Sequence, residues 1–146
     1  MTGISFHTPT EVALAYVRVF NKHDSVALRQ LYADDFVAQN PRWPDVKHVD
    51  EVYEAVTTVW AKLNRARFDL YNLIAQGPVV VLELRFVWSD DRAVEGEQPK
   101  IIDREFPVTD VFQVVNGKLA ALRAYQDTVP ITAWLAEVDR VRSGQR

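Results

Sequence analysis

The chain of 146 residues has a net charge of −3, with 48% hydrophobic and 25% charged residues. This is typical of one ordinary globular domain, which we assign to residues 1–146. The absence of cysteine excludes a disulfide scaffold, a thiolate nucleophile and cysteine-ligated metals. The weak negative charge argues against nucleic-acid or anionic-membrane partners. No apolar run approaches the ~18 residues of a membrane span and no signal peptide precedes the domain, so we predict a cytoplasmic protein.

Residue types that build common cofactor sites are scarce. The five glycines are far apart, so the sequence contains neither a GxGxxG turn nor a P-loop. No serine lies in a GxSxG elbow. His7, His23 and His48 lack the spacing of metal ligands. We therefore expect no cofactor and no metal.

The N-terminal third of the chain predicts two helices and a short strand. Thr8–Glu11 forms a capping box with proline at the first helical position, and the helix runs to about Lys22. Asp24 caps a second, short helix, which we expect to end in the stretch 32–35. A strand follows at Phe36–Asn40, before a segment with two prolines.

A third helix and four strands make up the rest of the predicted domain. Apolar residues recur at helical spacing from Val49 to Leu63. The turn Asn116-Gly117 is a strong hairpin signal, and Ser89–Pro99 is expected to be a long loop. Pro130 opens a last helix. The predicted strands are Arg67–Ala75, Val79–Trp88, Ile101–Val115 and Lys118–Tyr125.

Helices followed by an antiparallel sheet indicate an α+β fold. We expect a strongly curved, mainly antiparallel sheet that wraps around the three N-terminal helices as a cone-shaped barrel, with a C-terminal helix. A cavity between sheet and helices would then be the natural place for a ligand.

The alternation of residues along the strands predicts which side chains face that cavity. In Val79–Trp88 one face is entirely apolar, whereas Glu83 and Arg85 are expected to pair on the outer face. In the next strand an apolar face includes two ionisable residues, Arg104 and Asp110. A carboxyl group in apolar surroundings has a raised pKa unless a donor or cation compensates. Asp110 is therefore either a functional acid or a structural residue bonded to a tyrosine or backbone amide.

Two segments of the chain have a familiar pattern. The first runs from Tyr16 through Asp24 and Leu31-Tyr32-Ala33-Asp34-Asp35 to Asn40-Pro41, and the second is Val108-Thr109-Asp110-Val111-Phe112 followed by Asn116-Gly117-Lys118. Both resemble ketosteroid isomerases and, more widely, the SnoaL-like members of the nuclear-transport-factor-2-like superfamily. The resemblance covers most of the chain. It implies a single SnoaL-like domain over residues 1–146 with an apolar pocket, and a homodimer formed through the outer face of the sheet.

The resemblance also implies roles for site residues. Tyr16 and Asp110 match the isomerases' oxyanion-hole tyrosine and protonated aspartic acid, while Asn40 stands where their base aspartate lies. In limonene epoxide hydrolases, which are also similar, the functional Arg–Asp pair and water-activating aspartate correspond to three residues without a charge. These are Leu84, Phe86 and Ala124.

We expect a SnoaL-like enzyme that cyclises, isomerises or dehydrates a small hydrophobic carbonyl compound, polyketide- or steroid-like. Asp110 would be the acid/base and Tyr16 the oxyanion donor. Asn40 would orient the substrate carbonyl or a water, and Arg104 would anchor an anionic substituent or tune Asp110. The alternatives are a non-catalytic binding or dimeric assembly module and, less favoured, an epoxide hydrolase. The other predicted substrate-binding residues are Trp43, Trp60, Phe86, Trp88, Phe112 and Gln126.

Overall fold

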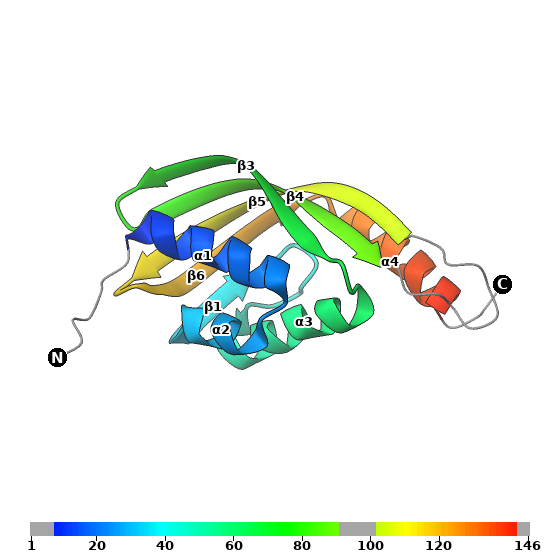
Figure 1. Cartoon of the computed structure of the whole chain (residues 1–146), viewed down its shortest axis with the longest axis horizontal. Helices are drawn as coiled ribbons and strands as arrows, with labels where there is room; N and C mark the ends of the chain where they lie inside the picture. The colour runs from blue at the N-terminus through cyan, green and yellow to red at the C-terminus, as the bar shows by residue number, and fades with distance from the viewer. Residues whose placement is uncertain (1–7, 91–101, 143–146) are drawn as a thin grey trace.

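A computed structural model of the chain describes residues 8–90 and 102–142, and it confirms the α+β architecture (Figure 1). Of the loop predicted at Ser89–Pro99, residues 91–99 lie outside the described residues, and 89–90 extend a strand. The helices are α1 (Pro9–Lys22), α2 (Ser25–Leu31), α3 (Val49–Lys62) and α4 (Thr128–Arg142). The strands are β1 (Tyr32–Gln39), β2 (Lys47–His48), β3 (Arg67–Gln76), β4 (Val79–Asp90), β5 (Ile102–Val115) and β6 (Lys118–Gln126).

The predicted caps fix the ends of the first two helices. The Thr8 hydroxyl accepts a hydrogen bond from the Glu11 amide at 3.2 Å, which satisfies a backbone donor of the first turn of α1. His23 ends α1 in the left-handed conformation, with φ 53°. Asp24 then caps α2 by accepting from the Ala27 amide at 3.0 Å. Because the C-cap of α1 and the N-cap of α2 are consecutive residues, α2 turns sharply against α1.

Helix α2 ends at Leu31 with Tyr32 as its C-cap, as predicted, but the stretch 32–35 is already part of a strand, so the predicted strand start at Phe36 was wrong. β1 begins at Tyr32 and pairs in parallel with β6, with a register shift between Tyr32 and Val37. Asp34 and Asp35 lie exposed at this irregularity, which explains why their polarity resembled a helix end. The two-residue strand β2, which pairs with Val37 and Ala38, was not predicted because so short a segment has no readable alternation.

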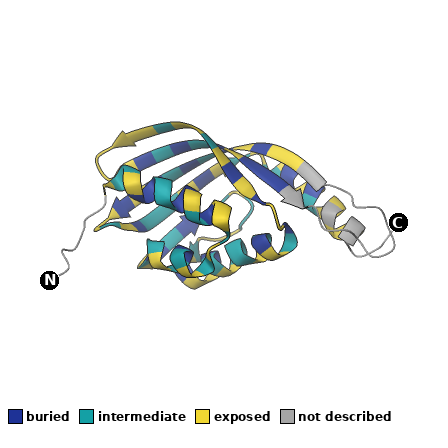
Figure 2. Cartoon of the chain, viewed as in Figure 1, coloured by how far each residue is buried: buried dark blue, intermediate teal, exposed yellow. Residues whose placement is uncertain are grey.

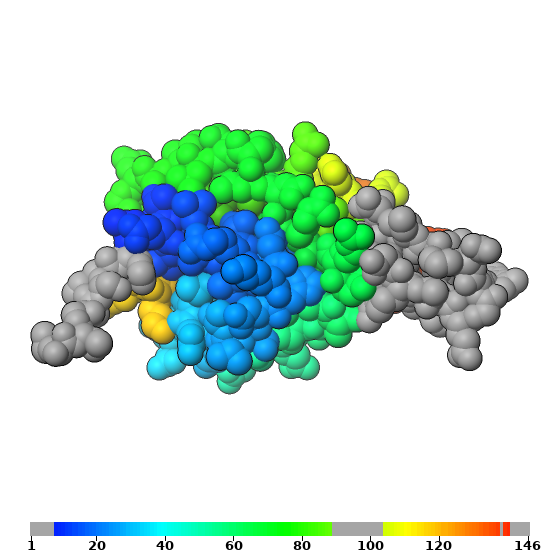
Figure 3. Space-filling model, viewed as in Figure 1, coloured from blue at the N-terminus to red at the C-terminus, as the bar shows by residue number. Residues whose placement is uncertain are grey.

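The six strands of the described chain form one sheet in the order β2-β1-β6-β5-β4-β3. All neighbouring pairs are antiparallel except β1 and β6. The sheet curves strongly, with α1, α2 and α3 on its concave side (Figure 1). Buried residues recur along the strands and on the inner faces of α1 and α3, and atoms of α1 and α2 cover the near side (Figures 2 and 3). The core therefore lies between the concave face and these helices.

Helix α4 covers one end of the sheet. It begins at Thr128, two residues before the predicted Pro130. Ile131 is fully buried, and the ring of Trp134 lies 5.6 Å from Trp88 and 5.8 Å from Phe106. No helix in the described part of the chain is long and apolar enough to cross a membrane.

The outer face of the sheet is polar in its centre, as predicted, but its ion pair differs from the expected one. Arg85 pairs with Glu105 of the neighbouring strand at 3.3 Å. Glu83 accepts a hydrogen bond from the side-chain amide of Asn72 at 3.3 Å. Glu105 is a diagonal neighbour of Arg85, which lies opposite Pro107, and Asn72 lies directly opposite Glu83. Both kinds of cross-strand neighbour are within reach of long side chains. The predicted pairing of Glu83 with Arg85 was therefore wrong, although both lie on the predicted face.

Candidate active site

Asp110 is a buried carboxyl group on the concave face of the sheet. It lies on β5 directly opposite Leu82 of β4 and Ala124 of β6, and its side chain is 3% exposed. Within residues 8–90 and 102–142, no hydrogen bond or ion pair to its carboxyl group is formed. Burial raises the pKa of Asp110 to about 7, because a low-dielectric environment disfavours the charged form. The group can therefore exchange a proton near neutral pH.

Tyr16 of α1 lies beside this carboxyl group. Its ring, 4% exposed, is 5.0 Å from the ring of Phe112. Burial raises the pKa of Tyr16, and the negative charges of Tyr32 and Asp110 raise it further. The same causes, burial first and then Asp110, raise the pKa of Tyr32. Tyr16 therefore keeps its proton and remains a hydrogen-bond donor while Asp110 titrates.

Asp110 and Tyr16 line a small inner cavity of about 80 Å³ between the sheet and helices α1 and α3. Ligand sites for drug-sized molecules usually measure about 300–1,000 Å³, so this cavity accommodates only the reacting end of such a molecule. Its walls are mainly apolar, and such surroundings raise the pKa of Asp110. The polar residues of the lining are Tyr16, Asn40, Arg42, Asp110 and Gln126, and the apolar ones include Phe20, Trp43, Val52, Val56, Phe68, Phe86, Val108 and Leu122.

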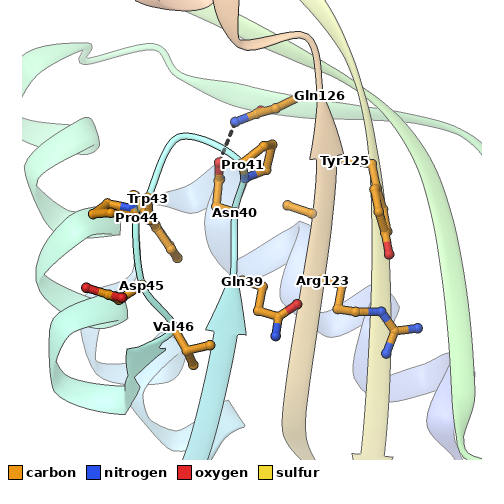
Figure 4. A pocket seen from close by; sticks show the side chains of 11 residues that line it. Gln39, Asn40, Pro41, Trp43, Pro44, Asp45, Val46, Arg123, Tyr125 and Gln126 are labelled. Carbon is orange, nitrogen blue, oxygen red and sulfur yellow. Dashed lines mark hydrogen bonds between the residues drawn. The ribbon is translucent and has the colours of Figure 1, made fainter.

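Asn40 and Gln126 separate the inner cavity from a larger outer pocket of about 540 Å³ (Figure 4). The Asn40 Oδ1 atom accepts from Nε2 of Gln126 and from the Arg42 amide, each at 2.9 Å. Trp43 and Ala124 also line both spaces. A hydrogen bond between β6 and the end of β1 holds the side chains of this boundary in place. The boundary between the two spaces is the first entrance to the inner cavity.

A second entrance lies on the other side of the segment after β1. Arg42, Ala55 and Val59 line both the inner cavity and a side pocket of about 430 Å³ between this segment, α3 and α4. Arg42 was not predicted as a site residue, because it lies between Pro41 and Trp43 in a segment without periodicity. An arginine next to a candidate site residue was the only available signal.

The other predicted site residues differ in position. Trp43 and Phe86 line the inner cavity, and Phe112 packs behind Tyr16. Trp88 lines the side pocket. Trp60 is buried outside these linings and stacks on the His23 ring at 5.0 Å. Their predicted roles in substrate binding remain predictions.

Arg104 does not share the cavity with Asp110, and the expectation of an ionisable pair inside the cone was wrong. Its side chain is exposed, with the guanidinium 5.8 Å from the centre of the Phe106 ring. Arg104 lies opposite Trp88, at the end of the sheet that α4 covers and α1 does not. Alternation assigned Arg104 to the correct face of β5. The cavity, however, lies over the part of this face near Asp110 and does not extend to Arg104.

The site residues do not include a metal centre. Among the described residues, no three His, Asp or Glu side chains cluster in a way that could hold a metal ion. The inner cavity brings together one titratable carboxyl group, a phenol, a guanidinium and two amides in apolar surroundings. The fold and this site define a cone-shaped α+β protein with an acid in an apolar pocket.

Comparisons with known proteins agree with this class. Residues 13–122 match the SnoaL-like domain, so the chain belongs to the SnoaL-like family. No curated protein sequence matches the chain. The fold is similar to that of a candidate SnoaL-like polyketide cyclase from Shewanella putrefaciens, with a TM-score of 0.73, 15% identity, and coverage of 91% of this chain and 88% of that one.

Two further solved structures show the same nuclear-transport-factor-2-like fold. IdmH from Streptomyces antibioticus, a candidate polyketide cyclase, has a TM-score of 0.72 and 17% identity over 89% of this chain and 99% of its own. AclR from Streptomyces galilaeus, a candidate hydroxylase, has a TM-score of 0.73 and 14% identity over 91% and 98%. These likenesses confirm the fold.

The raised pKa of Asp110 predicts a specific pH dependence of stability. In the unfolded chain the Asp110 carboxyl group ionises at its ordinary pKa near 3.8, whereas in the folded chain it keeps its proton up to about pH 7. Between these values the folded state binds more protons, so the free energy of unfolding falls as the pH rises. At about 1.4 kcal/mol per pKa unit, the loss is about 4 kcal/mol.

Urea unfolding of the Asp110→Asn variant from pH 4 to 9 measures this loss, because asparagine does not titrate. We expect the wild type to lose stability relative to Asp110→Asn as the pH passes from 4 to 7. Asp34→Asn, at an exposed aspartate, is the matched control and should follow the wild type. Parallel pH profiles of the wild type and Asp110→Asn would contradict the assignment.

The Asn40–Gln126 hydrogen bond predicts a barrier to entry from the outer pocket. Gln126→Ala removes the bond and widens the boundary, so a neutral aromatic probe such as 2-naphthamide should associate faster. The increase should reach up to about fivefold, the factor equivalent to a neutral hydrogen bond of about 1 kcal/mol. Stopped-flow fluorescence measures this rate. Gln113→Ala, at an exposed glutamine of β5, should leave it unchanged, and equal rates in both variants would exclude the barrier.

Proposed function

We propose that this protein is a cofactor-independent acid/base enzyme that cyclises, isomerises or dehydrates a small hydrophobic carbonyl compound. The proposal rests on one observation: the 3% exposed carboxyl group of Asp110 lines an apolar cavity and has no hydrogen-bond partner within the described chain. A buried polar group without a partner costs about 1–3 kcal/mol or more. A ligand that supplies or accepts a proton at this position would offset that cost.

The reaction would pass through an enol or enolate. Ionised Asp110 would take a proton from the carbon next to the substrate carbonyl, and the electron pair of the C–H bond would move onto the carbonyl oxygen. Tyr16 would donate a hydrogen bond to this oxygen as its charge develops. Protonated Asp110 would then return the proton to another carbon in an isomerisation, to the alkoxide in a cyclisation, or to a leaving hydroxide in a dehydration. A pKa near the working pH is suited to both steps.

Asn40 would orient the substrate as a hydrogen-bond donor. Its Oδ1 atom already accepts from the Arg42 amide and from Gln126, which leaves the Nδ2 amino group to bind a carbonyl oxygen or a water. An amide cannot act as a base at neutral pH, so Asn40 does not replace the base that related isomerases have at this position. The proton transfers would then fall to Asp110.

A non-catalytic binding module is the second candidate function. The observation that favours it is the volume of the inner cavity, about 80 Å³, which is too small to enclose a whole polyketide- or steroid-like molecule. A bound molecule would have to occupy the outer or side pocket as well. Under this reading Asp110 would bind a ligand without turning it over, and the two functions differ in whether proton exchange occurs.

Exchange of carbon-bound hydrogen tests the enzymatic function directly. Wild-type protein should catalyse deuterium incorporation next to the carbonyl of 1-tetralone in D2O, measured by proton NMR, with a rate that rises with pH through about 7. Asp110→Asn should lower the rate by about 10²–10⁴-fold, since it removes the acid/base. Tyr16→Phe should lower it by about 10²–10³-fold, since it removes the oxyanion donor.

Asp34→Asn serves as the control in this assay and should exchange at the wild-type rate. An Asp110→Asn variant that exchanges as fast as the wild type would exclude Asp110 as the acid/base. Binding of several aromatic ketones without exchange of any of them would favour the binding module.

We also propose a homodimer formed through the outer face of the sheet. Tyr71 and Ile74 of β3 and Tyr125 of β6 are 55–56% exposed there, and a partner would cover these large apolar groups. Ile74→Asp should shift a dimer toward the monomer in sedimentation velocity, because it places a charge in the contact. Val26→Asp, at an exposed valine of α2, is the matched control. A wild-type monomer, or a dimer unaffected by Ile74→Asp, would contradict the proposal.

A further inference from the structure

Arg42 is a partly buried cation at the inner cavity, in the segment between β1 and β2. Its guanidinium lies 5.6 Å from the centre of the Trp88 ring, and its Nε atom is buried without a hydrogen-bond partner. Burial lowers the pKa of this guanidinium. An arginine nevertheless remains protonated at physiological pH, so the site holds a positive charge with an unused donor.

No acidic side chain of the described chain pairs with Arg42. Three of the other four charged side chains at the side pocket interact elsewhere. Lys47 lies over the Trp43 ring at 5.3 Å, Lys62 pairs with Asp139 at 2.8 Å, and Glu51 accepts from the His48 amide at 3.2 Å. A buried charge without a counter-ion is costly, and this cost is offset when a ligand supplies the anion.

The position of Arg42 indicates how such a ligand would lie. Arg42, Ala55 and Val59 line both the side pocket and the inner cavity, where Asp110 also lies. When the anionic group of a ligand binds Arg42, the apolar part of the same ligand can therefore extend past Ala55 and Val59 of α3 to Asp110. The side pocket, at about 430 Å³, provides the volume that the inner cavity lacks.

We infer that Arg42 is the anchor for a carboxylate on the substrate, so that the ligand class is a hydrophobic carbonyl compound that also carries a carboxylate. The inference deepens the proposed function and rests on the same cavity. A carboxylate matches the planar fork of a guanidinium with two parallel hydrogen bonds. A phosphate dianion fits less well, because the exposed acids Glu51 and Glu54 also line the side pocket and would repel a second negative charge.

A matched pair of probes tests this inference without requiring turnover. Isothermal titration calorimetry would compare 2-naphthoate with its neutral analogue 2-naphthamide. Wild-type protein should bind the carboxylate about 10- to 100-fold more tightly, the range expected for hydrogen bonds to charged groups. Arg42→Gln should remove this preference, whereas Arg42→Lys, which keeps the charge and loses the fork, should retain part of it. Naphthyl phosphate is the third probe and should bind more weakly than 2-naphthoate.

Arg18→Gln is the matched control, because it removes a positive charge from an exposed position on α1 and should keep the wild-type preference. Circular dichroism and binding of 2-naphthamide would verify that Arg42→Gln is folded. The inference is overturned if the wild type does not prefer 2-naphthoate, if Arg42→Gln retains the full preference, if Arg18→Gln loses it as well, or if naphthyl phosphate binds best. Asp110→Asn should keep the preference, so failure of the exchange assay and failure of the anchor can be told apart.

Discussion

The central constraint on this structure is the burial of a carboxyl group in an apolar wall that offers it no partner. Asp110 lies among Leu82, Val108 and Phe112, with 3% of its side chain exposed. Ionising it there costs free energy, which raises its pKa to about 7. This burial lowers the free energy of unfolding as the pH rises toward 7. It also lets the group take up and release a proton near neutral pH. Stability and chemistry are therefore opposed at this one residue.

The curvature of the sheet makes this arrangement possible. A flat sheet covered by helices would fill the space in front of β5 with side chains, whereas the cone leaves a cavity of about 80 Å³. Helix α1 places Tyr16 against Phe112 on one side, and the end of β1 brings Asn40 to Gln126 on the other. Three segments far apart in the sequence thus surround one acid, and each is fixed by contacts of its own.

The sequence predicted those parts of the site that follow a regular period. Alternation along β5 placed Asp110 on the concave face, and helical spacing placed Tyr16 on the inner side of α1, as the structure has them. Alternation does not indicate where a covered face ends, which is why Arg104 was wrongly expected in the cavity. Arg42 was missed for a related reason. It lies in an irregular segment, where only the three-dimensional path of the chain determines what a side chain contacts.

The presence of one acid and no second carboxylate limits the chemistry that the cavity supports. Among the described residues that line the inner cavity, Asp110 is the only carboxylic acid, and Asn40 and Ala124 stand where related enzymes have one. A single group must then both remove and return the proton, so the donor and acceptor positions of the substrate must both lie within reach of one carboxyl group. Suprafacial isomerisation and intramolecular aldol-type closure meet this condition.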